Sequence, residues 1–297
     1  MRDCCLPPPL QPGDRLRAIA PSGALREAER FQQGLEVWRS RGYRVEISPH
    51  LSDRWGYLAG ADAVRRQQLF DALTAPDCRG ILCARGGYGG TRLLEGWQWP
   101  EVPPKWLIGF SDITSLLWSQ ARLGVSGVHG PLLTTLAAEP DWSQQRLFDW
   151  VEGRAIAPLQ GTGWGGSPVT GRLMPANLTV ATHLLGTPHE PDLTGVILAI
   201  EDVTEAPYRI DRLLTHWRMM GKLQQVSGVA IGRFSQCDPP PNIPSFTVAE
   251  VLRDRLHDLG LAIVSDLPFG HDGVNAALPV GPIATLDPQA GTLTLHP

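Results

Sequence analysis

Short apolar segments alternate with amphipathic helical segments along the first half of this chain. The helical segments, residues 24–41 and 61–73, carry apolar side chains at the spacing of one helix face. The apolar segments between and around them are typical of strands and occupy residues 16–20, 43–47, 80–84 and 106–108. This alternation predicts an α/β fold with a doubly wound parallel sheet. In such a sheet, ligands bind beyond the carboxyl ends of the strands.

A glycine- and proline-rich stretch separates the two halves of the chain. Residues 161–168 contain five Gly or Pro residues, and that composition disfavours regular structure. We therefore expect an N-terminal domain at residues 1–155, a linker at 156–170 and a C-terminal domain at 171–297. The C-terminal domain again mixes strand and helix patterns, and its tail predicts two strands around a turn. The fold expected is thus an N-terminal doubly wound domain plus a C-terminal α/β domain with a β-rich tail.

Composition and charge disfavour several classes of function. A net charge of −4 gives no electrostatic reason to expect nucleic acid or an anionic membrane as partner. No apolar run approaches the roughly 20 residues that span a bilayer, and the first residues lack the apolar core of a signal peptide. A cytoplasmic location is therefore expected, and the five cysteines suit free thiols there. Because no zinc-type His or Cys spacing is present, no metal site is expected. No cofactor is expected either.

A serine follows the fourth apolar segment in a strand–turn–helix pattern, where residues 108–114 read IGFSDIT. Such an elbow exposes the Ser111 hydroxyl at the carboxyl edge of the sheet. The backbone N–H of Asp112 could then face a developing oxyanion. Ile113 replaces the second glycine of G-x-S-x-G, which disfavours an ordinary α/β-hydrolase. A serine that only caps the following helix explains the same pattern, so both roles stay open.

A nucleophilic serine needs a histidine base and a carboxylate that orients it, and the second half of the chain offers both. The apolar segment 196–200 ends directly in Glu201, and segment 261–264 leads into the turn Pro268-Phe269-Gly270-His271. Each residue alone has an ordinary structural explanation, a helix cap or a turn histidine. Together they complete a Ser–Glu–His order in which each member follows an apolar strand.

A glycine-rich turn, Arg85-Gly86-Gly87-Tyr88-Gly89-Gly90, follows the third apolar segment. Glycines permit close backbone approach, so an N–H of this turn could be a second oxyanion donor. A phosphate cradle is the alternative, although the turn matches neither G-x-G-x-x-G nor a P-loop with its Lys-Ser/Thr. The residues leave these two interpretations open.

Taken together, these motifs resemble one known family, the LD-carboxypeptidases, which include murein tetrapeptide carboxypeptidases and microcin-immunity peptidases. The stretches that match, in family order, are IAPSG, GYLAGADAVRRQQL, ARGGYGGTRLL, LIGFSDITSLL, HGPLL, GTP, ILAIEDVTEAPYRIDRLLTHW and LPFGH. The resemblance implies a metal-independent serine peptidase with the triad Ser111, Glu201 and His271. It also implies an oxyanion hole built from the N–H of Asp112 and that of Gly86 or Gly87.

The resemblance further implies a cytoplasmic homodimer that hydrolyses the amide between an L-configured centre and a terminal D-amino acid. The expected partner is therefore a peptide, such as a murein tetrapeptide. A terminal carboxylate calls for an arginine, and the candidates are Arg85, Arg209 and Arg233. Two rival functions stay open: cleavage of peptidyl- or aminoacyl-nucleotides in antibiotic immunity, and ligand binding without catalysis.

One segment departs from the family pattern. The family usually has a glycine pair before an asparagine, whereas this chain reads Met174-Pro175-Ala176-Asn177. Pro175 fixes φ and removes an amide donor, and Ala176 disfavours a positive φ. If the segment is a loop that lines the substrate cleft, substrate choice differs from the family's. The sequence leaves open whether Trp164, in the expected linker, touches a ligand.

Overall fold

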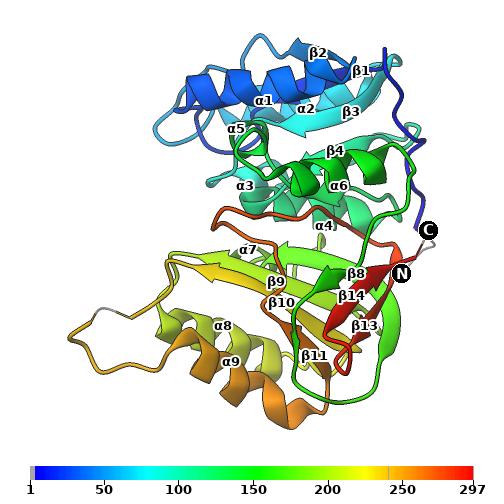
Figure 1. Ribbon diagram of the computed structural model, residues 1–297. Helices are drawn as coiled ribbons and strands as arrows, with labels where there is room; N and C mark the ends of the chain where they lie inside the picture. Colours follow the sequence, from blue (N-terminus) through cyan, green and yellow to red (C-terminus); the bar gives the residue numbers. More distant parts are fainter. Residues whose placement is uncertain (1–3, 240, 297) are drawn as a thin grey trace.

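The computed structural model describes residues 4–239 and 241–296, which form two sheets stacked one above the other (Figure 1). The helices among these residues are α1 Ala28–Ser40, α2 Asp62–Thr74, α3 Gly90–Leu93, α4 Thr114–Ala121, α5 Leu133–Leu136, α6 Asp141–Val151, α7 Leu178–Thr182, α8 Pro207–Met219 and α9 Val248–Leu256, with 3-10 turns η1 Ser111–Ile113 and η2 His257–Leu259. None of the helices in these two ranges is long and apolar enough to cross a membrane.

The first sheet is the predicted parallel sheet. Its strands, in the order β12-β5-β4-β3-β1-β2, are β12 Leu278–Pro279, β5 Val128–His129, β4 Trp106–Gly109, β3 Cys78–Cys83, β1 Arg15–Ile19 and β2 Arg44–Ile47. All neighbours are parallel except β12, which runs antiparallel to β5. Strand order reverses at β1, so the sheet is doubly wound and the expected fold class is confirmed. The glycine turn follows β3 and Ser111 follows β4, so both lie at one edge.

The second sheet is mixed. In the order β6-β14-β13-β8-β9-β10-β11-β7, its strands are β6 Leu159–Gln160, β14 Thr292–Leu295, β13 Ile283–Asp287, β8 Val169–Asn177, β9 Ile197–Val203, β10 Gly228–Ser235, β11 Ala262–Ser265 and β7 Thr162–Gly163. Strands β8 to β11 are parallel. Strands β13 and β14 form the antiparallel pair that the tail predicted.

Two local expectations were wrong. The stretch from residue 161 was expected to lack regular structure, yet β7 pairs with β11 across a gap of about a hundred residues. Glu201 was expected just after a strand, but β9 continues through it because β8 runs alongside and pairs Asn177 with Glu201. The domain boundaries stay a prediction; residues 278–279, which fall in the expected C-terminal domain, join the first sheet.

The departure at Met174–Asn177 lies in a strand and not in a loop. Pro175 and Ala176 are buried within β8 and pair with β9. The Pro175 carbonyl accepts a hydrogen bond from the Trp118 indole of α4, at 2.9 Å. Neither Pro175 nor Ala176 lines the cavities beside Ser111. A different substrate choice was expected only if this segment were a loop lining the cleft, and it is not.

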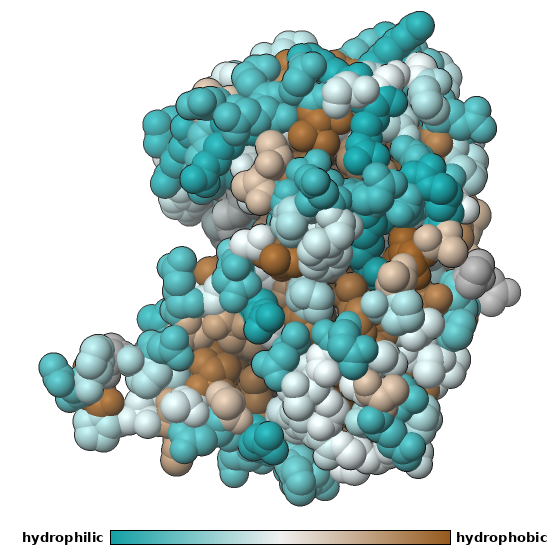
Figure 2. All heavy atoms as spheres, viewed as in Figure 1, coloured by the Kyte–Doolittle hydropathy of each residue, from teal (hydrophilic) through white to brown (hydrophobic). Residues whose placement is uncertain are grey.

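The two halves share apolar packing that fixes the carboxyl edges of their sheets. Trp118 of α4 packs edge-on against Trp217 of α8, with ring centroids 6.3 Å apart, and both are buried. The Asn177 amide at the end of β8 donates to the Thr114 hydroxyl at the start of α4, at 3.0 Å. On the face in Figure 2, the outline is notched between the N-terminal half above and the C-terminal half below.

Candidate active site

Ser111 has a backbone conformation that few residues other than glycine adopt. Its φ is +64°, and it lies two residues beyond the end of strand β4. Such a conformation costs about 1–3 kcal/mol and persists only where the surroundings impose it. Ser111 is half-buried, and its side chain caps neither η1 nor α4. The capping explanation of this serine is therefore wrong, and the strained elbow instead places its hydroxyl at the sheet edge.

The glycine turn lies directly against this elbow. A Cβ on Gly86 would lie 3.0 Å from the Ser111 Cβ and 3.2 Å from its Oγ, so only glycine fits without displacement. The Gly86 carbonyl accepts a hydrogen bond from the Gly23 amide at 3.0 Å. Within the described ranges, no acceptor is recorded for the N–H groups of Gly86 and Gly87. The turn can therefore offer backbone donors beside Ser111.

Two buried charged residues hold the turn in place. The Asp112 carboxylate accepts a hydrogen bond from the Gly90 amide at 2.7 Å, and it lies next to Ser111 in the chain. The fully buried Arg65 donates to the carbonyls of Pro21 and Gly89. Burial raises the pKa of Asp112, and the hydrogen bonds and Arg65 oppose that rise. The loops after β1, β3 and β4 are thereby joined into one unit.

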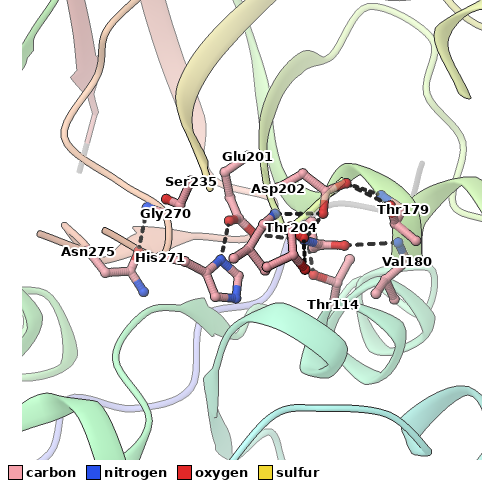
Figure 3. A network of polar contacts seen from close by, with 12 residues as sticks. Thr114, Thr179, Val180, Glu201, Asp202, Thr204, Ser235, Gly270, His271 and Asn275 are labelled. Carbon is pink, nitrogen blue, oxygen red and sulfur yellow. Dashed lines mark hydrogen bonds and ion pairs between the residues drawn. The ribbon is translucent and has the colours of Figure 1, made fainter. Parts of the chain in front are cut away.

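Glu201 and His271 form a direct hydrogen bond at the edge of the second sheet (Figure 3). The His271 Nδ1 lies 2.6 Å from the Glu201 Oε2. Glu201 is fully buried, and its other oxygen accepts from the Asn177 side-chain amide at 3.3 Å. Asn177 also donates to Asp202 at 2.9 Å. With Nδ1 held by the carboxylate, Nε2 is the nitrogen left to act as a base, and in Figure 3 it faces the N-terminal half.

The electrostatics of the pair favour a positively charged imidazole. Burial alone lowers the pKa of His271, but Glu201 at hydrogen-bond distance, helped by Asp202 and Asp272, outweighs it. The pKa of His271 is therefore raised above 6.5. Burial raises the pKa of Glu201, and the His271 charge opposes that rise. Such a pair stabilises an imidazolium once the histidine has taken up a proton.

The loop that carries His271 is fixed by backbone contacts to β10. Gly270 has φ +136°, and a Cβ there would lie 3.0 Å from the Arg233 carbonyl oxygen, so glycine is required. The Arg233 amide donates to the Phe269 carbonyl at 2.8 Å, and the Phe269 side chain is fully buried. The Gly270 amide donates to the Asn275 side chain at 3.2 Å. These contacts explain the glycine and the apolar residue before His271.

Two cavities flank Ser111. The smaller, of about 180 Å³, is lined by Ser111, His271, Gly86 and Gly87 among others. The larger, of about 390 Å³, shares Ser111 and Gly87 but not His271. Phe110 packs against the His271 ring, with centroids 4.6 Å apart. Among the described side chains no hydrogen bond joins the Ser111 hydroxyl to His271, and such bonds often tighten only once substrate is bound.

The arginines named from the sequence lie in different places. Arg85 lines the smaller cavity and forms an ion pair with Glu27 at 3.2 Å. Arg209 lies on α8, pairs with Glu205 at 3.5 Å and is 54% exposed, and it lines neither cavity. Arg233, exposed on β10, also lines neither.

Trp164 lies against the second sheet. Its indole donates to the Ser265 hydroxyl at 3.0 Å, and the Arg253 guanidinium lies 4.9 Å from its ring. Trp164 is not among the residues that line the two cavities beside Ser111.

Three residues at the site were missed by the sequence reasoning. Asn177 orients Glu201, and Arg30 lines the smaller cavity. His129 is fully buried at the end of β5, with its Nε2 4.0 Å from the Glu201 Oε1. Burial, reinforced by the charge on His271, lowers the pKa of His129 to about 3, so this histidine is neutral. His129 lies in the stretch HGPLL that matches the family, and Asn177 ends the segment that departs from it, but nothing local indicated that either reaches Glu201.

No metal-binding cluster is found in the part of the chain that the structure describes. Three or more His, Cys, Asp or Glu side chains gather nowhere in residues 4–239 and 241–296 in a way that could hold a metal ion. The described cysteines are all free thiols.

Comparison with known proteins gives consistent matches over most of the chain. The sequence model of the LD-carboxypeptidase N-terminal domain matches residues 16–130, and that of the C-terminal domain matches residues 170–286. A putative carboxypeptidase of Synechocystis sp. is 58% identical over 97% of this chain and 96% of its own length. The murein tetrapeptide carboxypeptidase of Pseudomonas aeruginosa is 32% identical over 93% of this chain and 94% of its own.

Solved structures give the same fold. Muramoyltetrapeptide carboxypeptidase from Oxalobacter formigenes superposes with a TM-score of 0.83 at 28% identity, over 95% of this chain and 97% of that one. The microcin C7 self-immunity protein MccF superposes with a TM-score of 0.89 at 20% identity, over 98% of each chain. At that identity, the second match is a likeness of fold alone.

Proposed function

Because the chain belongs to the LD-carboxypeptidase family, we propose that it is a serine peptidase that releases a terminal D-amino acid from a murein peptide. Ser111 is the nucleophile, His271 the base and Glu201 the residue that orients the base. The observation that carries this proposal is the strained Ser111 elbow, which lines one cavity with a histidine already bound to a buried carboxylate. The names of the Pseudomonas and Oxalobacter proteins support the choice of a murein peptide.

Acylation is the first half of the proposed reaction. The Ser111 Oγ attacks the carbonyl carbon of the scissile amide while His271 Nε2 takes the hydroxyl proton. Glu201 stabilises the imidazolium, and the N–H of Asp112 with that of Gly86 or Gly87 binds the oxyanion. Each such donor contributes about 3 kcal/mol of barrier lowering. His271 then gives its proton to the departing nitrogen as the C–N bond breaks.

Deacylation releases the shortened peptide. Water attacks the Ser111 ester while His271 removes its proton, and the same donors bind the second oxyanion. The proton then returns from His271 to the Ser111 Oγ as the ester bond breaks. The triad is thus regenerated, and one water is consumed per amide cleaved.

We expect kcat/KM to rise with pH through a pKa above 6.5, because His271 must be neutral to act as base and its pKa is raised. Glu201→Gln removes the carboxylate that raises this pKa, whereas burial, which lowers it, remains. The residual activity of this variant should therefore rise at a lower pH than that of the wild type. A pH–rate profile of both enzymes, with circular dichroism as the check of folding, measures the shift. An unshifted profile would contradict the assigned pair.

The proposed mechanism has a serine hydroxyl as its nucleophile, so none of its steps uses a metal ion. We expect turnover to be unchanged after exhaustive dialysis against EDTA. The measurement is the initial rate before and after dialysis, with and without added zinc. Loss of activity in EDTA that zinc restores would overturn the serine mechanism.

The substrate is tested by mass spectrometry of products. The protein is incubated with a murein tetrapeptide and, separately, with an aminoacyl sulfamoyl adenosine of the kind bound by MccF. Release of a single D-alanine from the tetrapeptide is expected. Cleavage of the nucleotide conjugate alone would instead favour an immunity function, which the likeness of fold to MccF keeps as the second candidate. If neither compound is cleaved and Ser111 resists serine-directed probes, the protein is a binding protein.

The finer expectations from the sequence belong to this proposal. A cytoplasmic location, a homodimer and the division at residues 156–170 follow from sequence pattern and family resemblance. They stay predictions, and the proposed acylation and deacylation steps depend on none of them.

A further inference from the structure

We propose that the smaller cavity beside Ser111 is the leaving-group site and that Arg85 and Arg30 bind the carboxylate of the departing amino acid there. This inference rests on the proposed function and adds to it the direction in which the peptide lies. The acyl part of the substrate then occupies the larger cavity on the other side of Ser111.

The direction follows from the proton that His271 must deliver. In acylation the imidazolium protonates the nitrogen that leaves, so the leaving group has to lie beside His271. His271 lines the smaller cavity of about 180 Å³, and it does not line the larger one of about 390 Å³. A productive peptide therefore has its terminal residue in the smaller cavity.

The charge of the two cavities agrees with this direction. Arg85 and Arg30 both line the smaller cavity, together with one carboxylate, Glu27. The larger cavity is lined by Asp112, Asp202 and Glu205 and by no lysine or arginine. A terminal carboxylate placed there would meet like charges, whereas in the smaller cavity it meets two cations.

Arg85 is held so that one end of its guanidinium stays available. Its Nε donates to the Glu27 carboxylate at 3.2 Å, which fixes the orientation of the group. Among the described residues no acceptor is recorded for its two terminal nitrogens. This end of a guanidinium binds a carboxylate through two parallel hydrogen bonds. Arg30 likewise has no recorded hydrogen bond or ion pair within the described ranges, so its charge is also available.

The size and lining of the smaller cavity limit what can leave. Phe110, Leu132, Thr134 and Thr135 complete its lining, and this mix of apolar and hydroxyl groups suits a small side chain such as that of alanine. The hydroxyl of Thr134 donates to the Ala84 carbonyl at 3.1 Å, so this wall is fixed. A cavity less than half as large as its neighbour suits one terminal residue, while the larger cavity suits the remaining peptide.

The test compares a murein tetrapeptide with the same peptide carrying a C-terminal amide. Amidation removes the carboxylate and leaves the scissile bond intact. For the wild type we expect kcat/KM to be about 10- to 100-fold lower for the amide, as for the loss of a charge-assisted hydrogen bond. In the Arg85→Ala variant, the ratio of kcat/KM for the acid to kcat/KM for the amide should fall towards one, because only the free acid loses a partner. The fall should be larger in the double variant Arg30→Ala with Arg85→Ala.

Two controls separate the outcomes. Arg26→Ala removes a nearby exposed positive charge that lines neither cavity, and it should leave the acid-to-amide ratio unchanged. Binding of the acid and the amide to Ser111→Ala, measured by calorimetry with and without the arginine changes, tests recognition even without turnover.

An acid-to-amide ratio that the arginine variants leave unaltered in both assays overturns the inference. Equal losses for acid and amide would place the arginines on the acyl side and would also overturn it. Absence of turnover with an intact binding ratio would count against the proposed function alone.

Discussion

Replacing Ser111 with alanine is expected to lower kcat by about 10⁴- to 10⁶-fold, the range seen when a single member of a catalytic triad is removed. The reason is that the Ser111 hydroxyl is the proposed nucleophile, and alanine cannot form the acyl-enzyme. Stability should change little, because alanine removes only one half-buried hydroxyl for which no hydrogen-bond partner is recorded among the described residues. Turnover of the murein tetrapeptide and the melting temperature are the two measurements.

The double variant Ser111→Ala with His271→Ala provides the sharper control. A histidine that acts only through the Ser111 proton contributes nothing once the hydroxyl is absent, so the double variant should be hardly slower than either single one. Losses that multiply would mean that the two residues act independently. Arg26→Ala serves as the control, because this exposed residue lines neither cavity and should leave kcat unchanged.

Adding a side chain at Gly86 is expected to lower kcat by about 10²- to 10³-fold, as for the loss of one oxyanion donor. The Cβ of Gly86→Ala would lie 3.2 Å from the Ser111 Oγ, and Gly86→Val would crowd the reacting carbonyl further. Because the substrate is bound mainly by the two cavities, KM should change far less than kcat. Steady-state kinetics of the wild type and both variants measures this split.

Gly56→Ala is the control for adding a Cβ to a glycine away from the site. Gly56 has φ +60°, and no atom lies within 4 Å of the position that a Cβ would take there, so its replacement adds backbone strain without touching the site. It should lower the melting temperature and leave kcat unchanged.

If the glycine turn instead cradles a phosphate, the wild type should bind ATP, which calorimetry would detect. Loss of that binding in the Gly86 variants, with peptide turnover intact, would replace the oxyanion assignment.

The chain's local patterns were enough to predict the first sheet and to place Ser111 and the glycine turn at its carboxyl edge. Apolar strands that alternate with amphipathic helices can bury their surfaces in few other ways, so the doubly wound sheet followed from periodicity. Parallel strands bring their carboxyl ends to one edge, which is why Ser111 and the glycine turn could be expected to meet. The pairing of Glu201 with His271 was predicted from a strand end and a turn, although β9 continues through Glu201 instead of ending before it.

Contacts between distant segments were decided only by the tertiary structure. The strands at residues 159–163 exist because their hydrogen-bond partners come from β14 and β11, about a hundred residues or more later, and outweigh a composition that disfavours strands. Pro175 lies in a strand for the same reason, since β9 supplies its neighbour.

The surroundings of each charged group were also set by the fold. Asn177 reaches Glu201 because β8 runs beside β9, and His129 approaches the same carboxylate from the other half of the molecule. Arg30 and Arg85 belong to different elements, and their shared cavity arises from how α1 packs beside the turn after β3. The sequence by itself determined that the glycine turn and Ser111 follow the third and fourth strands, because those positions depend on local backbone preference. Only the tertiary structure decided the burial, partners and pKa of those groups, because these depend on segments that the chain brings together from far apart.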